Sequence, residues 1–152
     1  LPPEIGQLTH LEYLGLINND LTSLPPEIGQ LASLQSLYLY HNKLTSLPPE
    51  IGQLTRLEEI FLDDTGLTSL PPEISQLTNL RNLSLSVNGL TSLPPELGQL
   101  TNLERLFPGD YFFPLSQEVG DTVQGIRMGE NRGVKFPGKD TASPDMVIMS
   151  MG

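Results

Sequence analysis

Leucines recur along the chain in one fixed pattern and divide it into units of 23 residues. Apolar side chains stand at positions 11, 14, 16 and 21, and the same spacing returns at 34–44, 57–67 and 80–90. The octapeptide that begins at Leu1 reappears at 24, 47, 70 and 93, and only Ser75 and Leu97 depart from it. A period held through five copies indicates an architecture in which each unit stacks on its neighbours.

The Leu-x-x-Leu-x-Leu stretch of each unit predicts a short strand. Leu14 and Leu16 alternate with Tyr13, Gly15 and Ile17, so the two leucines face one side of the strand and the other three residues face the opposite side. Stacking such units buries the leucine side, which a single unit cannot do alone.

The residues that follow this stretch, up to the next octapeptide and through it, predict a turn and a helical segment. The side chain of Asn19 can bond the backbone of the turn, and its copies at 42 and 88 predict a ladder of asparagines that Thr65 interrupts. Pro25-Pro26 stops the strand and favours a short helical or 3-10 turn, with Glu27 placed well at its N-terminus.

The complete pattern, L-x-x-L-x-L-x-x-N-x-L within 23 residues, resembles the leucine-rich repeat family. The repeated Leu-Pro-Pro-Glu-Ile-Gly-Gln-Leu segment is similar to repeats of Ras-group leucine-rich scaffolds and of many bacterial repeat proteins. The resemblance implies an α/β repeat fold, a solenoid with a parallel β-sheet on its concave side and short helical or 3-10 turns on its convex side. It also implies protein binding without catalysis in the repeats.

The repeat pattern ends near position 106. We expect residues 1–106 to hold about four complete units with partial ends, and residues 107–152 to form a non-repeat tail. Two interpretations of the tail stay open: its aromatic first part, 107–115, caps the last repeat, or the tail belongs to an unrelated domain or is not selected to fold here. For 116–152 we expect weak or irregular order, with a hairpin around Gly129–Gly133 and a strand at Met146–Met149 as candidate elements.

Charge and composition disfavour some classes of partner. The chain carries 8 Lys+Arg against 18 Asp+Glu, a net charge of −10, which disfavours nucleic acid and anionic membranes. It has no run of 18 apolar residues and no cysteine. The first residue is leucine, so we expect a piece of a longer protein. We further expect a soluble monomer, and the compartment stays open with a slight preference for the cytoplasm.

Catalytic and metal chemistry find little support. Gly133–Lys139 fits G-x-x-x-x-G-K, but Asp140 stands where a phosphate loop needs Ser or Thr, so we expect no phosphate site. His41 with Asp63 and Asp64 could hold a metal ion, but a polar rim of a binding surface is the favoured interpretation. We predict no catalytic residue, no cofactor and no metal.

The positions that vary between units are where function is expected. Tyrosine, isoleucine and phenylalanine side chains from three adjacent strands should form one exposed patch bordered by acids, which is typical of a protein interaction site. The acidic border predicts a partner with a basic patch. The competing explanation is that aromatic residues simply suit strands. The candidate partner-binding residues are Tyr13, Ile17, Tyr38, Tyr40, His41, Glu59, Phe61, Asp63 and Asp64.

Three functions remain open at this point. The first is a non-catalytic protein-protein interaction module that uses its concave face. The second is the substrate-recognition arm of a larger enzyme, such as a ligase, kinase or GTPase, whose catalytic domain lies outside this chain. The third is a near-consensus array whose face binds nothing in particular.

Overall fold

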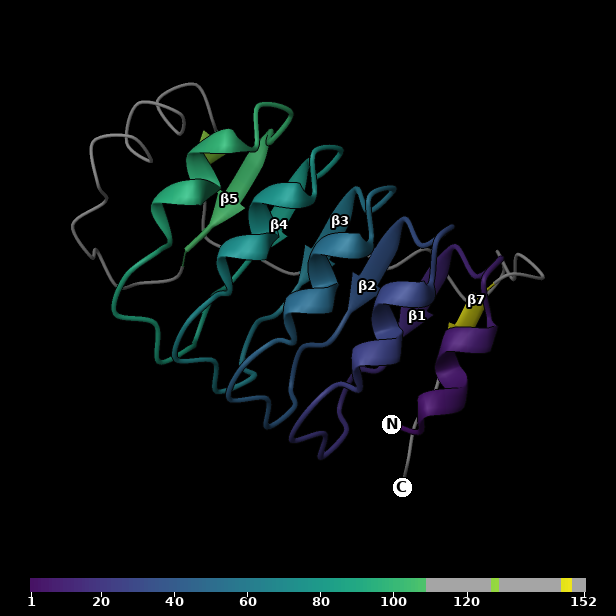
Figure 1. Ribbon diagram of the computed structural model, residues 1–152. Helices are drawn as coiled ribbons and strands as arrows, with labels where there is room; N and C mark the ends of the chain where they lie inside the picture. Colours follow the sequence, from purple (N-terminus) through teal and green to yellow (C-terminus); the bar gives the residue numbers. More distant parts are fainter. Residues whose placement is uncertain (109–126, 129–145, 149–152) are drawn as a thin grey trace.

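The computed structural model describes residues 1–108, 127–128 and 146–148. Within them the chain alternates between short 3-10 turns and short strands, one of each per repeat unit (Figure 1). The 3-10 turns are η1 (Pro3–Gln7), η2 (Pro26–Gln30), η3 (Pro49–Gln53), η4 (Pro72–Gln76) and η5 (Pro95–Gln99). The strands are β1 (Tyr13–Gly15), β2 (Ser36–Tyr38), β3 (Glu59–Phe61), β4 (Asn82–Ser84), β5 (Arg105–Phe107), β6 (Arg127–Met128) and β7 (Met146–Ile148).

The Pro-Pro pair sets the start of every 3-10 turn. In the second unit Pro25 is extended, with φ −69° and ψ 149°, and Pro26 is the first residue of η2. Proline costs little there because the first N–H of a helical turn has no partner within the turn. The turn closes where the N–H of Leu31 donates to the carbonyl oxygen of Ile28 at 3.2 Å. The expected helical or 3-10 turn is therefore a 3-10 turn.

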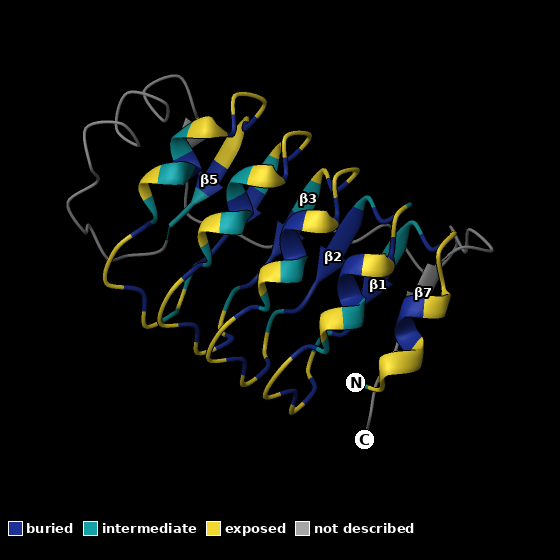
Figure 2. Cartoon of the chain, in the orientation of Figure 1, coloured by how far each residue is buried: buried dark blue, intermediate teal, exposed yellow. Residues whose placement is uncertain are grey.

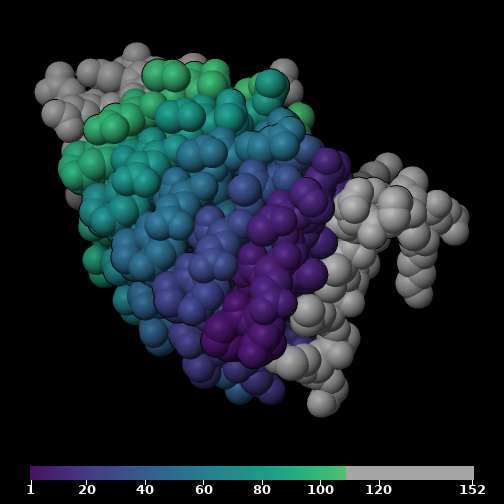
Figure 3. Space-filling model, turned by 45° about the vertical axis from the view of Figure 1, so that its right-hand side comes forward, coloured from purple at the N-terminus to yellow at the C-terminus, as the bar shows by residue number. Residues whose placement is uncertain are grey.

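The strands form one open parallel sheet in the order β6-β5-β4-β3-β2-β1-β7. Residues 23 positions apart lie opposite each other, as Tyr13 does to Ser36 and Ser36 does to Glu59. The space-filling view shows the units following one another in chain order as successive bands (Figure 3). Because the register equals the repeat length, equivalent positions of all units fall into straight rows across the sheet.

The core is a continuous column of leucine and isoleucine between the sheet and the 3-10 turns (Figure 2). In the middle units these side chains are fully buried, as Leu37, Leu39 and Ile51 illustrate with 0% exposure. Each buried leucine or isoleucine contributes about 1.5–3 kcal/mol. Every unit therefore depends on its neighbours for stability, as the sequence predicts for a stacked array.

The predicted asparagine ladder is present on the side where the strands end. Asn42 Nδ2 donates to the carbonyl oxygens of Leu16 at 2.8 Å and Leu39 at 2.6 Å. Asn88 Nδ2 makes the equivalent bonds to Leu62 and Leu85. Thr65 stands between them with one hydroxyl, 2.9 Å from the Leu62 oxygen, and so lacks the two amide donors.

Several expectations fall on the tail. The strand expected at Met146–Met149 corresponds to β7. The hairpin around Gly129–Gly133 lies outside the described residues, as does the proposed cap beyond residue 108. The tail division at 106 stays a prediction. Within the part of the chain that the structure describes, no helix has the length and hydrophobicity needed to cross a membrane.

Candidate functional site

The outer face of the sheet, here called the concave face, is built from three rows of side chains. The first row crosses the strands as Tyr13, Ser36, Glu59, Asn82 and Arg105, and the second as Gly15, Tyr38, Phe61, Ser84 and Phe107. The third row follows the strand ends as Ile17, Tyr40, Asp63 and Ser86, with the same 23-residue spacing. The candidate residues predicted on these strands therefore do lie on one face.

Two aromatic rings form the centre of this face. Tyr38 and Phe61 are stacked, with ring centroids 5.3 Å apart and an interplanar angle of 14°. Their exposed fractions are 9% and 6%, so the prediction that these two residues are exposed is wrong. In part, each ring covers a face of the other, because the register places them directly opposite across β2 and β3. Tyr13, Ile17 and Tyr40 are half-buried.

Glu59 is held by its neighbours on both sides. The hydroxyl of Tyr38 donates to Glu59 Oε2 at 3.2 Å, and Asn82 Nδ2 donates to Glu59 Oε1 at 2.7 Å. Both carboxylate oxygens thus have a donor. Burial, and secondarily the charge of Glu59, raises the pKa of Tyr38 to about 12, so this phenol stays protonated at neutral pH.

The two carboxylate oxygens of Asp63 differ in their hydrogen bonds. Its Oδ1 accepts from the Ser84 hydroxyl at 2.6 Å and from the Ser86 N–H at 3.2 Å. Among the described residues, Asp63 Oδ2 is buried and has no hydrogen-bond partner. Burial, followed by the charge of Asp63, raises the pKa of Tyr40 to about 12.

His41 and Asp64, two of the predicted rim residues, form a pair next to Asp63. His41 Nδ1 lies 2.9 Å from Asp64 Oδ2, and both side chains are exposed. The ring of His41 also packs edge-on against Tyr40, with centroids 5.4 Å apart. Among the described residues no three His, Cys, Asp or Glu side chains gather closely enough to hold a metal ion.

The rim has an unusual backbone. One residue per unit has a positive φ there, at 54° for Asn18, 57° for His41, 49° for Asp64 and 56° for Val87. This left-handed conformation is tolerable for asparagine and aspartate but is an outlier for a β-branched valine.

The repeat spacing places Ser84 and Ser86, the partners of Asp63, on the concave face, but they are not among the candidate partner-binding residues. Ser84 and Ser86 are neither aromatic nor charged, so they do not stand out as site residues, although they anchor Asp63 from the next strand. Their position 21 and 23 residues after Asp63 is the signal that could have identified them.

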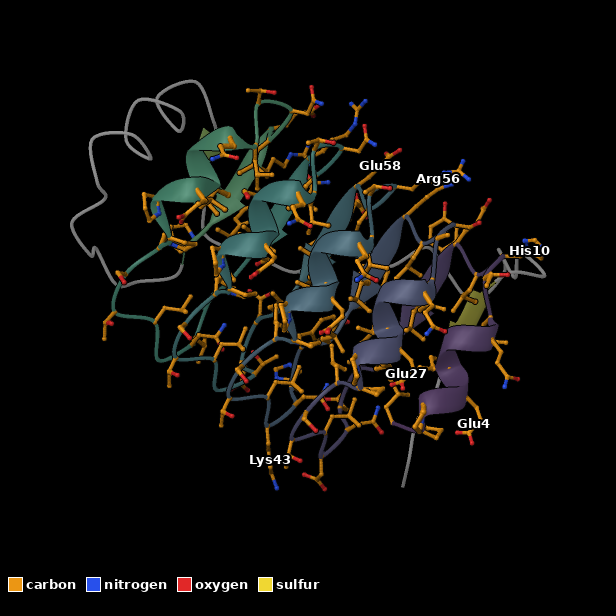
Figure 4. All side chains as sticks on the ribbon, viewed as in Figure 1. Glu4, His10, Glu27, Lys43, Arg56 and Glu58 are labelled. Atoms are coloured by element: carbon orange, nitrogen blue, oxygen red, sulfur yellow. The ribbon has the colours of Figure 1, made fainter. Side chains whose placement is uncertain are left out.

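The convex side carries a line of glutamates, one on each 3-10 turn. Glu4 on η1 and Glu27 on η2 are its first two members and are labelled in Figure 4.

The architecture has close counterparts among solved structures. A leucine-rich repeat protein of Leptospira interrogans gives a TM-score of 0.75 and 41% identity, covering 85% of this chain and 33% of its own length. The leucine-rich repeat domain of the type III effector XopL gives 0.65 and 34% identity, covering 70% of this chain and 39% of that chain. The plant peptide hormone receptor RGFR1, solved in complex with RGF2, gives 0.73 and 29% identity, covering 84% and 21%.

This chain spans about a third of the length of the first of these structures. A comparison with curated proteins found no match. A family model described as a leucine-rich repeat region matches residues 3–107, and such regions are typically non-catalytic and mediate protein-protein interaction. Together with the parallel sheet and its 23-residue register, this match shows that the chain belongs to the leucine-rich repeat family.

Proposed function

We propose that this chain is a non-catalytic module that binds a protein partner through its concave face. The observation that carries the proposal is the composition of that face on β1 to β4 and at the third-row positions that follow these strands. It combines aromatic rings with two carboxylates and contains no lysine or arginine. Aromatic side chains are the usual anchors of protein interfaces.

The negative charge of this face favours a partner with a basic patch. Glu59 and Asp63 lie on either side of Phe61 along β3 and its end, and Asp64 adds a third carboxylate at the rim. Of these, Asp63 has the buried Oδ2 without a donor. A buried carboxylate oxygen without a hydrogen bond is unfavourable. A lysine or arginine of the partner would be steered toward this face by the three carboxylates.

The burial of Tyr38 and Phe61 decides which substitutions can test the proposal. A glutamate at either position would place a charge in a site that is at least nine-tenths covered, and the fold would suffer. Tyr40 and Asp63 are half-buried at the end of the same strands, so they are better targets. The double change Tyr40→Ser/Asp63→Asn removes one ring and one charge.

The experiment compares three immobilised forms of residues 1–152 in capture from source-cell lysate. They are the parent, Tyr40→Ser/Asp63→Asn, and the convex control Glu27→Gln/Glu50→Gln, which removes two charges from the opposite side. We expect the parent and the convex control to retain the same protein and the concave variant to lose it, with all three equally folded by circular dichroism. Raising the salt concentration should weaken capture. Equal capture by all three forms would contradict the use of the concave face.

The alternative of a recognition arm of a larger enzyme is favoured by no feature of the described residues. It predicts the same concave contact, so the capture experiment does not separate it from a free-standing module. The protein that is captured would separate them.

A further inference from the structure

Two short strands from the C-terminal part of the chain occupy the two opposite edges of the repeat sheet. β7 pairs in parallel with β1, and Val147 lies opposite Leu14 (Figure 1). β6 pairs in parallel with β5, and Met128 lies opposite Leu106. The five repeat strands therefore lie between two strands that the repeat pattern does not contain.

The backbone of β1 is oriented to accept such a strand. In the repeat sheet the N–H groups of the leucines point to the following strand, as Leu16 donates to Tyr38 and Leu39 to Phe61. The N–H group of Ser36, 23 residues after Tyr13, donates in the opposite direction, to Glu12 in the preceding unit. Since N–H groups alternate along a strand, Tyr13 and Gly15 direct theirs toward the edge where β7 lies.

We propose that this edge of β1 is a strand-accepting site whose ligand is the chain's own segment Met146–Ile148. An open edge of a sheet presents unpaired N–H and C=O groups that pair readily with another chain. Docking of β7 satisfies those of β1 within one molecule. It thereby prevents two copies from pairing edge to edge.

The connection is long enough for this arrangement. From β6 to β7 the sheet has six strand spacings, roughly 29 Å at about 4.8 Å each. Residues 129–145 join the two strands in sequence, and an extended chain covers about 3.3 Å per residue, so the distance can be bridged with a large margin. The same molecule can therefore supply both edge strands.

The test is hydrogen exchange of individual amides, followed by NMR on the 15N-labelled chain 1–152. Val147→Pro removes an N–H from the centre of β7, and proline is poorly tolerated in a paired strand. We expect the amides of Tyr13 and Gly15 to exchange at least about tenfold faster in this variant, while those of Leu14 and Leu16 keep their protection because they face β2. Thr141→Pro, a proline placed before β7, should leave all four amides as in the parent.

Two results would overturn the proposal. If Tyr13 and Gly15 exchange equally fast in the parent and in Val147→Pro, β7 does not protect this edge. If their protection in the parent rises with protein concentration, a second copy supplies the strand and the docking is not intramolecular. Protection that is independent of concentration and is lost in Val147→Pro supports it. These results concern the β1 edge only, so they are independent of the proposed concave site.

Discussion

The side-chain amide of Asn42 donates a hydrogen bond of 2.8 Å to the carbonyl oxygen of Leu16 in the preceding repeat unit. The same nitrogen donates to Leu39 within its own unit, and Asn42 Oδ1 accepts from the N–H of Leu21. One buried side chain thus satisfies three backbone groups of two neighbouring units. The units are coupled by polar contacts as well as by leucine packing.

Replacing Asn42 with alanine should therefore destabilise the fold strongly. The change leaves the oxygens of Leu16 and Leu39 and the N–H of Leu21 without this partner, and a buried unpaired polar group costs about 1–3 kcal/mol. We expect the free energy of unfolding to fall by about 3 kcal/mol, measured by urea denaturation. A loss below about 1 kcal/mol would show that water or a local shift replaces these bonds.

The interruption of the ladder at Thr65 permits the opposite test. Thr65→Asn adds amide hydrogens that can reach the oxygens of Leu39 and Leu62, as those of Asn42 and Asn88 do in their units. We expect a gain of about 1 kcal/mol in the same urea experiment. Thr65→Val, which removes the hydroxyl, should instead lose stability, because the Thr65 hydroxyl lies 2.9 Å from the Leu62 oxygen. A loss with Thr65→Asn would mean that the pocket is too small for the amide.

The convex layer has a glycine at the same position in four of its five 3-10 turns, η1, η2, η3 and η5. A Cβ at Gly29 would lie 2.6 Å from the backbone oxygen of Glu50 in the next unit, so the two turns would have to move apart. The fourth unit carries Ser75 at this position, so such a shift is possible, and we expect Gly29→Ala to cost about 1–2 kcal/mol. Gly89→Ala is the control: its nearest contact would be 3.5 Å, so no loss is expected. Thermal melting of both variants tests the difference.

Val87 is held in a conformation that suits it poorly. It has φ 56° and is 63% exposed, while the equivalent residues are asparagine, histidine and aspartate. The left-handed conformation costs an ordinary residue about 1–2 kcal/mol, and asparagine tolerates it better. Val87→Asn should therefore raise the free energy of unfolding by about 1 kcal/mol. Val87→Ala, which still has a Cβ and no polar group, should gain less; an equal gain would assign the effect to lost exposed apolar surface.

Alkaline pH should lower the stability of the fold through two tyrosines of the concave face. Tyr38 and Tyr40 have pKa values of about 12 in the folded chain against a usual value of 10.0. The unfolded chain releases these protons first, so stability that is fully present below about pH 10 falls as the pH rises toward 12. We expect the part of the phenolate absorbance at 295 nm that comes from Tyr38 and Tyr40 to appear only above about pH 10. The variant Tyr38→Phe/Tyr40→Phe should lose less stability than the parent between pH 9 and 11. An equal loss in parent and variant would assign the alkaline effect to other groups.

Much of the fold can be predicted from the sequence because the sequence repeats. The alternation of Leu14 and Leu16 with Tyr13 and Gly15 predicts which side of the strand enters the core, and the Pro-Pro pair predicts where each turn begins. With a period of 23, stacked units must place equivalent residues in rows, so the repeat spacing alone is enough to name the residues on the concave face.

The sequence is thus sufficient to predict the unit, its register and the face on which each side chain lies, because these depend on local alternation and on a constant period. How far each of those side chains is covered, and which partner it meets, depends on the packing of the folded chain. Tyr38 and Phe61 lose their exposure partly through each other, and Asp63 is held by serines of the next unit. β7 reaches the β1 edge from the far end of the chain. The repeat spacing brings the residues of the repeat units side by side, but their exposure and their hydrogen bonds depend on how the side chains pack in three dimensions.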